Sequence, residues 1–464
     1  METKTIRPFG WKDKIGYMFG DFGNDFTFIF ASLFLMVFYT KVLGVSPEVV
    51  GTLFLVARCV DAVTDVTMGR IVDRLKPGKN GRFRPWLLRM CGPVAVASFL
   101  MYQGSMAEAS MTIKVIYMFV TYLLWGSVCY TAINIPYGSM ASVLSEDADD
   151  RASLSTFRSL GALLAQLVVG VGAPLLVYTT DAAGNQLVEG GRMTLIAGIF
   201  SVFAIICYIV CYCLTVERVK VEPSAKEERV SLLKTIEALF TNRALLGIIL
   251  AAILLLLASL LTQSVNQYVF IDYFNDKNAL SIMGLAGLLP SFLIVPLVKP
   301  LTKKFGKKEI SAVGCIIAGA ASIFLFVLRV KSAFLFIVIS ILGYLGFGFF
   351  NMVIWAFVTD VIDDQEVRTG RREDGMVYAI YSFSRKIGQA LAGGFGAFAL
   401  AIVGYDSSVQ VQTEAVTNGI YNVATLLPGL LYIGVGLCLI FVYPLSKKRV
   451  DENVAILKQK RENN

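Results

Sequence analysis

The sequence contains no histidine and is poor in charged residues, which make up 16% of its 464 residues. Without histidine, acid–base or cation chemistry near neutral pH has to rest on carboxylates. The eight cysteines all lie within apolar runs and show no Cys-x-x-Cys spacing, which indicates packing residues and neither disulfides nor a zinc site. Hydrophobic residues reach 56%, more than soluble globular proteins carry, so the composition predicts a polytopic membrane protein.

Long apolar runs recur along the whole chain. A helix needs about 20 predominantly apolar residues to cross a hydrocarbon core of about 30 Å. The runs therefore predict an all-α membrane protein with twelve transmembrane helices, near residues 15–42, 49–72, 87–106, 112–143, 153–177, 193–215, 244–271, 279–299, 310–328, 332–361, 375–403 and 419–443.

The net charge of +8 is concentrated in one set of loops. Lys and Arg are dense before the first helix, after the second and the eighth, in the middle connection and in the tail, whereas the opposite loops hold few. By the positive-inside rule we expect both termini in the cytoplasm, a location in the cytoplasmic (inner) membrane, lipid as a partner and no nucleic acid. The predicted parts are an N-terminal six-helix half (1–215), a cytoplasmic middle loop (216–243), a C-terminal six-helix half (244–445) and a cytoplasmic tail (446–464).

The middle loop contains a stretch, Ser231–Phe240, in which apolar residues alternate with Lys and Glu at helical spacing. This pattern predicts a helix lying along the membrane surface, and a solvated linker is the alternative.

A cytoplasmic sequence element occurs once in each half. Gly69-Arg-Ile-Val-Asp73-Arg74 leads into Gly81-Arg-Phe-Arg-Pro85, and Val298–Lys308 occupies the matching place in the second half. Two six-helix halves with a repeated element indicate a major facilitator fold with pseudo-symmetric halves. We interpret Gly69, Asp73 and Arg74 as a gating motif, because Asp73 can cap a helix end and pair with basic residues.

The second predicted helix carries Arg58, Asp61 and Asp65 on one face, since they are spaced i, i+3 and i+7. Each ionised side chain at the centre of a spanning helix costs roughly 2.5–3.5 kcal/mol, so the three must meet polar partners. One hypothesis is a cation site in which Asp61 and Asp65 supply carboxylate oxygens and Thr64 or Thr131 adds a hydroxyl. Sodium and a proton both fit, and Arg58 is the charge partner. The alternative is that Arg58 and Asp61 only neutralise each other and pin helices together.

Polar residues from both halves are expected at one depth. Asp25, Asp61, Asn134 and Lys386 lie nine to eleven residues from the cytoplasmic ends of their helices, which is roughly 14–17 Å and close to the midplane. Substrate sites of transporters lie at this level. Further candidates for the site are Asp21, four residues from Asp25; Tyr130 and Thr131, on the face of Asn134; and Arg158, for which an interfacial position is the alternative.

Five motifs resemble the glycoside-pentoside-hexuronide:cation symporters of the major facilitator superfamily. They keep their order along nearly the whole chain, and they are Gly16-Tyr-Met-Phe-Gly-Asp-Phe-Gly-Asn-Asp25, Gly51-Thr-Leu-Phe-Leu-Val-Ala-Arg58-Cys-Val-Asp61-Ala-Val-Thr-Asp65, Gly81-Arg-Phe-Arg-Pro-Trp86, Asn134-Ile-Pro-Tyr-Gly-Ser139 and Tyr381-Ser-Phe-Ser-Arg-Lys386-Ile-Gly-Gln.

The resemblance implies roles for individual positions. In the melibiose permease branch, residues matching Asp25 and Arg158 bind sugar, and the lysine matching Lys386 links the two halves. Residues matching Asp61, Asp65 and Thr131 form its cation site. This chain departs from that branch at Asn134, Gly138 and Thr64, where the branch has aspartate, tryptophan and asparagine. The Asn134 and Lys386 motifs are more similar to glucuronide carriers and pentoside members. An amide in place of a carboxylate suits an anionic sugar that pairs with Lys386 or Arg385, and it suits a neutral xyloside equally.

The sequence thus predicts a symporter that imports a hexuronide or a pentoside by alternating access, functions as a monomer, and needs no cofactor beyond the coupling cation, sodium or a proton. A transporter of a lipid or drug is an alternative, disfavoured by the polar level. A sugar sensor that does not transport is another. An intramembrane enzyme is disfavoured because histidine is absent and family motifs account for the aspartate pairs.

Overall fold

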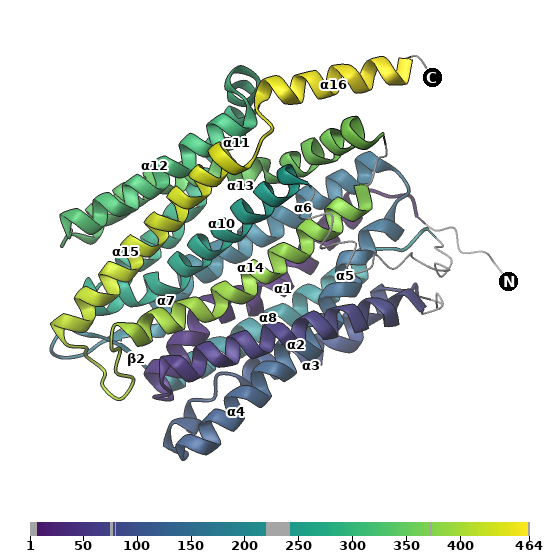
Figure 1. Ribbon diagram of the computed structural model, residues 1–464. Coiled ribbons are helices and arrows are strands. Elements are labelled where there is room, and N and C mark those ends of the chain that lie inside the picture. Colours follow the sequence, from purple (N-terminus) through teal and green to yellow (C-terminus); the bar gives the residue numbers. More distant parts are fainter. Residues whose placement is uncertain (1–6, 75–77, 79, 220–241, 371–373, 463–464) are drawn as a thin grey trace. The chain divides into compact units, whose positions relative to one another are not determined.

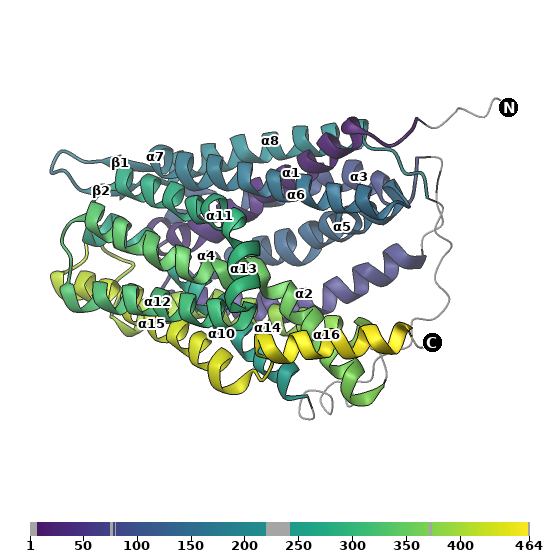
Figure 2. The ribbon, with the colours of Figure 1, turned by 90° about the horizontal axis from the view of Figure 1, so that it is seen from above.

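A computed structural model describes residues 7–74, 78, 80–219, 242–370 and 374–462, and some side chains within its helices are left undescribed. The chain forms two compact units. One comprises Met1–Glu227 and Tyr405–Gln412, and the other Glu228–Gly404 and Thr413–Asn464. Figures 1 and 2 show that almost every described element is a helix.

The first unit contains long helices, some of which continue directly into π-helical turns, and one small hairpin. Its elements are α1 (Trp11–Val37), η1 (Phe38–Val42), α2 (Pro47–Arg74), α3 (Arg84–Leu100), η2 (Gly104–Glu108), α4 (Met111–Leu123), η3 (Leu124–Tyr130), α5 (Thr131–Leu144), α6 (Ala148–Leu167), η4 (Val168–Gly172), α7 (Ala173–Val177), β1 (Tyr178–Thr180), β2 (Gln186–Val188) and α8 (Gly190–Leu214).

The second unit is helical throughout its described part. Its elements are α10 (Arg243–Tyr268), η5 (Val269–Tyr273), α11 (Lys277–Phe305), α12 (Lys307–Leu328), α13 (Ala333–Thr369), α14 (Asp374–Ile402), α15 (Glu414–Leu437), η6 (Cys438–Val442) and α16 (Lys447–Glu462).

Each of the twelve predicted spans coincides with a helical segment, in some cases one that includes a π-helical turn. Within the described residues, nine segments are long and apolar enough to cross a membrane. The other three predicted spans are α2, which carries Arg58, Asp61 and Asp65, α3, which has 17 residues, and α14, whose apolar part is Ile387–Ile402. The sequence therefore predicted the all-α membrane architecture correctly. The predicted surface helix Ser231–Phe240 lies outside the described residues.

Several helices begin at a polar side chain that satisfies a free backbone N–H. Asp147, Asn242 and Asp276 accept hydrogen bonds in this way at the N-termini of α6, α10 and α11. The start of α3 is capped from far along the chain, because Glu217 accepts from the backbone N–H groups of three consecutive residues at 2.6–2.8 Å. These are Arg82, Phe83 and Arg84, so the Gly81-Arg-Phe-Arg-Pro85 motif is fixed to the segment that follows α8.

The β1–β2 hairpin is a tight antiparallel turn in which Tyr178 pairs with Val188. Asp181 accepts from the backbone N–H groups of Asn185 and Ala183 and from the side chain of Asn185. These hydrogen bonds, those from Asn185 above all, hold the pKa of the Asp181 carboxyl below its ordinary value. The hairpin is therefore ordered by its own side chains.

Glycines allow close helix contacts at defined places. A Cβ at Gly161 of α6 would meet the Met18 carbonyl oxygen of α1, and a Cβ at Gly23 of α1 would lie 2.9 Å from Cys207 of α8. In the second unit, a Cβ at Gly314 of α12 would meet the carbonyl oxygen of Gly346 in α13. Small residues at such crossings let helix backbones approach, which is how helices gain packing energy in a membrane. In the first unit these contacts bring α6 and α8 against the polar part of α1.

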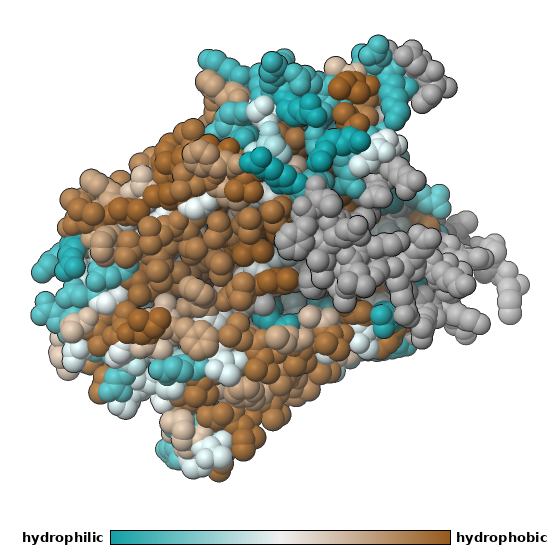
Figure 3. Space-filling model, in the orientation of Figure 1, coloured by the Kyte–Doolittle hydropathy of each residue, from teal (hydrophilic) through white to brown (hydrophobic). Residues whose placement is uncertain are grey.

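The outer surface of the helices is apolar. In Figure 3 the surface over α12 and α15 is largely brown, whereas teal residues gather around α16. Val313 and Val327 of α12 and Leu430 of α15 are more than half exposed. Contiguous apolar surface of this kind needs lipid around it, which agrees with an integral membrane protein.

Candidate functional site

The charged residues of α2 meet partners on their own helix and on the neighbouring η3–α5 segment. Arg58 Nη1 lies 3.2 Å from Asp61 Oδ2, and the Ser127 hydroxyl donates to Asp61 Oδ1 at 2.6 Å. Arg58 Nε is buried and has no hydrogen-bond partner among the described residues. Asp61 therefore holds two groups, of which one was expected from the sequence and the other, Ser127, was not.

The second acidic residue of α2 repeats this arrangement one turn further along. The Thr131 hydroxyl lies 3.0 Å from Asp65 Oδ1 and 3.2 Å from the Gly126 carbonyl oxygen. Asp61 to Asp65 and Ser127 to Thr131 are both steps of four, so the two segments run in the same direction with matching faces. The π-helical turn η3 lies at this contact, and π-helical turns are frequent at functional sites.

Thr64 occupies a different position from Thr131. Its hydroxyl lies 3.2 Å from the carbonyl oxygens of Val60 and of Asp61, both on its own helix. Of the two threonines considered from the sequence, the structure places Thr131 against a carboxylate. The arrangement offers carboxylate, hydroxyl and carbonyl oxygens from two segments, the kinds of ligand that hard cations prefer.

A second polar cluster connects α1, α5 and α6. Arg158 Nε donates to Asp21 Oδ1 at 2.9 Å, and the Arg158 guanidinium lies 5.5 Å from the centre of the Tyr137 ring. Tyr137 stacks on Tyr17 with ring centres 4.7 Å apart, and its hydroxyl donates to the Tyr17 carbonyl at 2.7 Å. The Arg158 side chain stays 42% exposed while that of Asp21 is 9% exposed, so the pair has a buried end and an open end.

Asp25 lies one turn along α1 from Asp21 and is half-buried. Among the described residues it makes no hydrogen bond or ion pair. A carboxylate in this position has acceptor capacity to offer to the hydroxyl groups of a ligand.

Asn134 of α5 is tied to α1 and, through it, to α8. Asn24 Nδ2 donates to Asn134 Oδ1 at 3.2 Å, and the Tyr208 hydroxyl donates to Asn24 Oδ1 at 2.6 Å. Asn24 and Tyr208 are buried, whereas Asn134 is half-buried. The three side chains form one hydrogen-bonded chain that ends at the predicted sugar position.

Tyr130 lies in an aromatic cluster next to these residues. Its ring stacks on Phe28 of α1 with centres 5.6 Å apart and lies 5.4 Å from the ring of Trp125. The three residues of the predicted polar face thus make different contacts. Tyr130 lies in an aromatic cluster, Thr131 contacts the Asp65 carboxylate, and Asn134 contacts the Asn24 amide.

The remaining predicted site residues are only partly described. The side chains of Asp73, Arg74 and Lys386 lie outside the described part of the chain, although their backbones belong to α2 and α14. Gly69 lies in α2, and a Cβ there would meet nothing within 4 Å. Arg385, next to Lys386, lies 3.4 Å from the Tyr381 hydroxyl and over the ring of Trp355.

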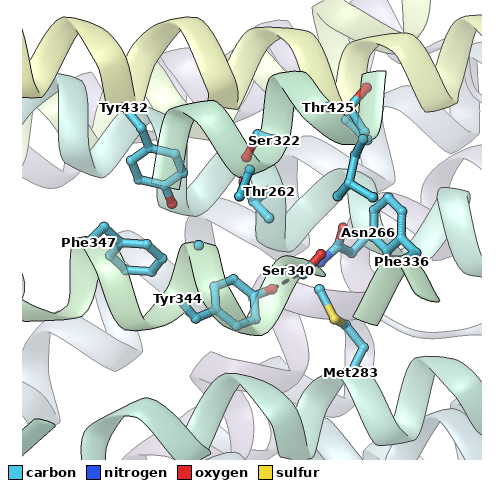
Figure 4. A pocket seen from close by; sticks show the side chains of 14 residues that line it. Thr262, Asn266, Met283, Ser322, Phe336, Ser340, Tyr344, Phe347, Thr425 and Tyr432 are labelled. Carbon is cyan, nitrogen blue, oxygen red and sulfur yellow. Dashed lines mark hydrogen bonds between the residues drawn. The ribbon is translucent and has the colours of Figure 1, made fainter. Parts of the chain in front are cut away.

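A small cavity of about 30 Å³, lined by both polar and apolar side chains, lies inside the second unit (Figure 4). Thr262, Ser322 and Thr425 line it, and each donates its hydroxyl hydrogen to the carbonyl oxygen four residues earlier. Figure 4 shows the Tyr344 hydroxyl directed at Asn266, from which it accepts at 3.5 Å. Sites for small organic ligands measure roughly 300–1,000 Å³, so this cavity has room for about two water molecules and not for a sugar.

Sequence reasoning missed Ser127, Asn24 and Tyr208. Ser127 precedes Thr131 by four residues, so the helical spacing carried a signal that was not used. Asn24 adjoins Asp25, but adjacent residues point about 100° apart on a helix. Tyr208 lies in an otherwise apolar run and gave no signal.

The described residues contain no group of three or more His, Cys, Asp or Glu side chains placed to hold a metal ion. A monovalent cation carried as cargo needs fewer acidic ligands, and two carboxylates with two hydroxyls provide mixed oxygen ligation. In the first unit, Asp61 and Asp65 offer carboxylate oxygens of the kind that bind hard cations, and Asp21, Asp25, Asn134 and Arg158 offer groups that can hydrogen-bond a polar solute.

Comparison with known proteins covers nearly the whole chain. Residues 16–447 match the model of the family described as MFS/sugar transport protein. The chain is 31% identical to the uncharacterized symporter YjmB of Bacillus subtilis, over 99% of this chain and 98% of that protein. It is 29% identical to the glucuronide carrier protein homolog of Escherichia coli, over 96% of this chain and 94% of that protein. The crystal structure of a D-xylose-proton symporter has the same fold, with a TM-score of 0.61 at 13% identity, covering 94% of this chain and 97% of that one.

Proposed function

Because the chain belongs to the MFS/sugar transport protein family, we propose that it is a cation-coupled symporter that imports a glycoside by alternating access. It is an integral membrane protein and a transporter of sugar-like molecules, not an enzyme. What we propose beyond this is the coupling cation, the cargo and the direction of transport.

The observation that carries the proposal is the presence of two separate polar clusters inside one unit. One pairs Asp61 and Asp65 with the hydroxyls of Ser127 and Thr131. The other places the Asp21–Arg158 ion pair near Asn134 on neighbouring turns of α1 and α5. Charged side chains inside a membrane protein are expensive and mark ion or substrate paths. Two clusters of different chemistry fit a carrier that binds a cation and a sugar together.

In this proposal Asp61, Asp65 and Thr131 bind the cation, and Arg58 balances the charge. Thr64 is the second choice for a hydroxyl ligand, because its hydroxyl lies against carbonyl oxygens of its own helix. Asp21, Asp25, Tyr130, Asn134, Arg158 and Lys386 serve the sugar and its coupling, and Gly69, Asp73 and Arg74 serve gating. Tyr130 fits a role in which an aromatic ring stacks on the apolar face of a pyranose.

The cargo we favour is a hexuronide, with a pentoside as the second choice. An amide at position 134 carries no negative charge to repel a uronate, and Arg158 is a guanidinium with an open end. One relative is a glucuronide carrier homolog, which supports the same choice.

The density of Lys and Arg before α1, after α2 and in the tail supports a cytoplasmic location for both termini in the inner membrane. We take the transporting unit to be a monomer, because both predicted sites lie within one chain.

The experiment that tests the proposal is uptake into proteoliposomes containing the purified protein. Labelled glucuronides, xylosides and galactosides are supplied with either a sodium gradient or a proton gradient imposed alone. We expect accumulation of a glucuronide or xyloside above its external concentration with one gradient, and equilibration without a gradient. Absence of uptake for all three sugar classes under both gradients, in vesicles with intact orientation and insertion, would contradict the proposal.

A further inference from the structure

The orientation of the Asn134 side-chain amide is set by residues outside the predicted sugar site, so that its oxygen faces α1. Tyr208 donates to Asn24 Oδ1 at 2.6 Å, and Asn24 Nδ2 donates to Asn134 Oδ1 at 3.2 Å. Each step uses one donor and one acceptor, so the direction of the first bond sets the direction of the second. Asn134 Oδ1 is occupied at the end of this chain, whereas no described residue hydrogen-bonds Asn134 Nδ2.

Burial locks this direction. Asn24 is 1% exposed, and Tyr208 is fully buried. If Asn24 alone turned over, its oxygen would face Asn134 Oδ1. If Asn24 and Asn134 both turned over, Asn24 Nδ2 would donate to the Tyr208 oxygen, and the buried Tyr208 hydroxyl hydrogen would have no acceptor among the described residues. Leaving a buried polar group unpaired costs about 1–3 kcal/mol, so the observed direction is the stable one while Tyr208 donates.

The packing of α8 on α1 makes the chain possible. A Cβ at Gly23, next to Asn24, would lie 2.9 Å from the Cys207 Cβ and 3.2 Å from the Ala204 carbonyl oxygen. The glycine therefore lets α8 approach close enough for the Tyr208 hydroxyl to reach Asn24.

We propose that Tyr208 and Asn24 are positioning residues that hold the N–H groups of Asn134 toward the cargo, so that Asn134 selects an acceptor-only group, the carboxylate of a uronide. The inference rests on the proposed function and makes it more specific. A sugar hydroxyl can donate or accept, whereas a carboxylate only accepts, so a fixed pair of donors favours the carboxylate. Asp25 plays the opposite part in this proposal, because a carboxylate accepts hydrogen bonds from sugar hydroxyls whereas the Asn134 NH₂ donates them.

The first test is Tyr208→Phe in the full-length protein in proteoliposomes. KM and kcat are measured for a glucuronide and for the neutral glucoside with the same aglycone. The variant removes the donor that orders the chain and keeps the ring. We expect KM for the glucuronide to rise about tenfold, the effect of losing about 1.4 kcal/mol of oriented hydrogen bonding. KM for the glucoside and both kcat values should change little.

The matched control is Tyr102→Phe. Tyr102 is also fully buried in the first unit, but its hydroxyl has no hydrogen-bond partner among the described residues. The same chemical change there should leave the ratio of the two KM values at the wild-type value.

A second variant, Asn24→Asp, tests the direction of the chain and does not depend on the folding of the first. The new carboxylate still accepts from Tyr208 but can no longer donate to Asn134. The Asn134 amide then turns its NH₂ toward α1 and its oxygen toward the cargo, which should raise the glucuronide KM at least as much. Adding Tyr208→Phe to Asn24→Asp should cause no further loss of discrimination, because the direction is already reversed.

The outcomes separate the two levels of the proposal. A folded Tyr208→Phe or Asn24→Asp variant with an unchanged ratio of KM values would overturn the positioning role. Wild-type protein that accumulates the glucoside but not the glucuronide would overturn the acceptor-only assignment and leave the proposed sugar symport standing. Wild-type protein that accumulates no sugar would overturn the proposed function and this inference with it.

Discussion

The two units differ in the kind of polar side chain that lies inside them. The first unit carries ion pairs partway along its helices, with buried Asp21 paired to Arg158 and half-buried Asp61 paired to half-buried Arg58. In the described part of the second unit, the interior cavity is lined by neutral hydroxyl and amide groups such as Thr262 and Asn266. Its paired carboxylates, Asp360 and Asp364, lie toward the C-terminal end of α13.

The difference indicates a division of labour. Neutral hydroxyls that donate to carbonyls of their own helix cost little and serve packing, whereas taking a charged group out of water costs several kcal/mol per ion, so charges kept inside a membrane protein mark functional sites. We therefore expect substitutions in the two polar clusters of the first unit to change binding and coupling, and substitutions of the neutral groups that line the cavity of the second unit to change stability alone.

The largest effect is expected for Asp61→Asn. The change removes a charged ligand from the predicted cation site and leaves Arg58 without its partner. Gradient-driven accumulation of sugar in proteoliposomes should be lost, so that the sugar only equilibrates across the membrane.

The comparison variant is Asp364→Asn in the second unit. Asp364 accepts from Asn453 at 3.0 Å and pairs with Arg449, so it fastens α16 to α13. Its loss should loosen α16 and leave accumulation intact. Asp61→Asn protein that still accumulates sugar against its gradient would remove the cation assignment.

A large effect on both stability and binding is expected for Gly161→Leu. The new side chain would meet the Met18 carbonyl oxygen and push α6 away from α1, which separates Arg158 from Asp21. Overpacking of this kind costs about 1–3 kcal/mol, so the unfolding midpoint in detergent should fall by several degrees. Sugar affinity, measured by isothermal titration, should fall as well.

Two further glycine variants make this prediction specific. Gly314→Leu in the second unit should lower the midpoint to a similar extent without changing sugar affinity, because its clash is with Gly346. Gly92→Leu, where a Cβ meets nothing within 4 Å, should change neither quantity. Equal loss of affinity in Gly161→Leu and Gly314→Leu would show that affinity follows stability alone.

A moderate effect is expected for Ser127→Ala. The hydroxyl lies 2.6 Å from Asp61 Oδ1 and either binds the cation or holds the carboxylate that does. The loss of one such contact is worth about 0.5–1.5 kcal/mol, so the cation concentration for half-maximal uptake should rise roughly 2- to 12-fold. Ser159→Ala, whose exposed hydroxyl donates to its own helix, is the control and should have no effect. Unchanged cation dependence in Ser127→Ala would place the cation elsewhere.

The smallest effect is expected for Tyr432→Phe in the second unit. The Tyr432 hydroxyl has no hydrogen bond of good geometry among the described residues, and its neighbour Thr262 donates to Ala258. Stability should therefore stay within about 0.5 kcal/mol of the wild type, and uptake should be unchanged. Thermal unfolding and uptake are the measurements, and a large loss of either would mean that the cavity of the second unit has a functional role.

Much of the fold could be predicted from the sequence, because a bilayer leaves few choices. A run of about 20 apolar residues must be helical when no water is present to satisfy its backbone. The span predicted at 244–271 is accordingly helical in the structure, as α10 and η5. The stripe of Arg58, Asp61 and Asp65 was also visible, because helical spacing fixes which residues share a face. The Arg58–Asp61 contact follows from that spacing alone.

Of the partners across helices, Thr131 was a candidate beside Asp61 and Asp65 from the sequence, whereas Ser127, Asn24 and Tyr208 were not predicted. Spacing within α2 shows that Asp61 and Asp65 share a face, but it does not show which neighbouring helix that face meets or at what height. Contacts with Ser127 and Thr131 depend on the rotation of η3 and α5 against α2, which packing sets. The Tyr208 contact depends on an approach between α1 and α8 that Gly23 permits but does not by itself specify.

The sequence by itself thus determined the membrane-spanning helices, the cost of the charges they carry and the resemblance to sugar transporters. The tertiary structure alone decided which hydroxyls hold Asp61 and Asp65, and that Asn134 is ordered by Asn24 and Tyr208. The physical reason is that burial and spacing act within one helix, whereas hydrogen-bond direction depends on the rotation and distance between helices, which emerge only when all of them pack.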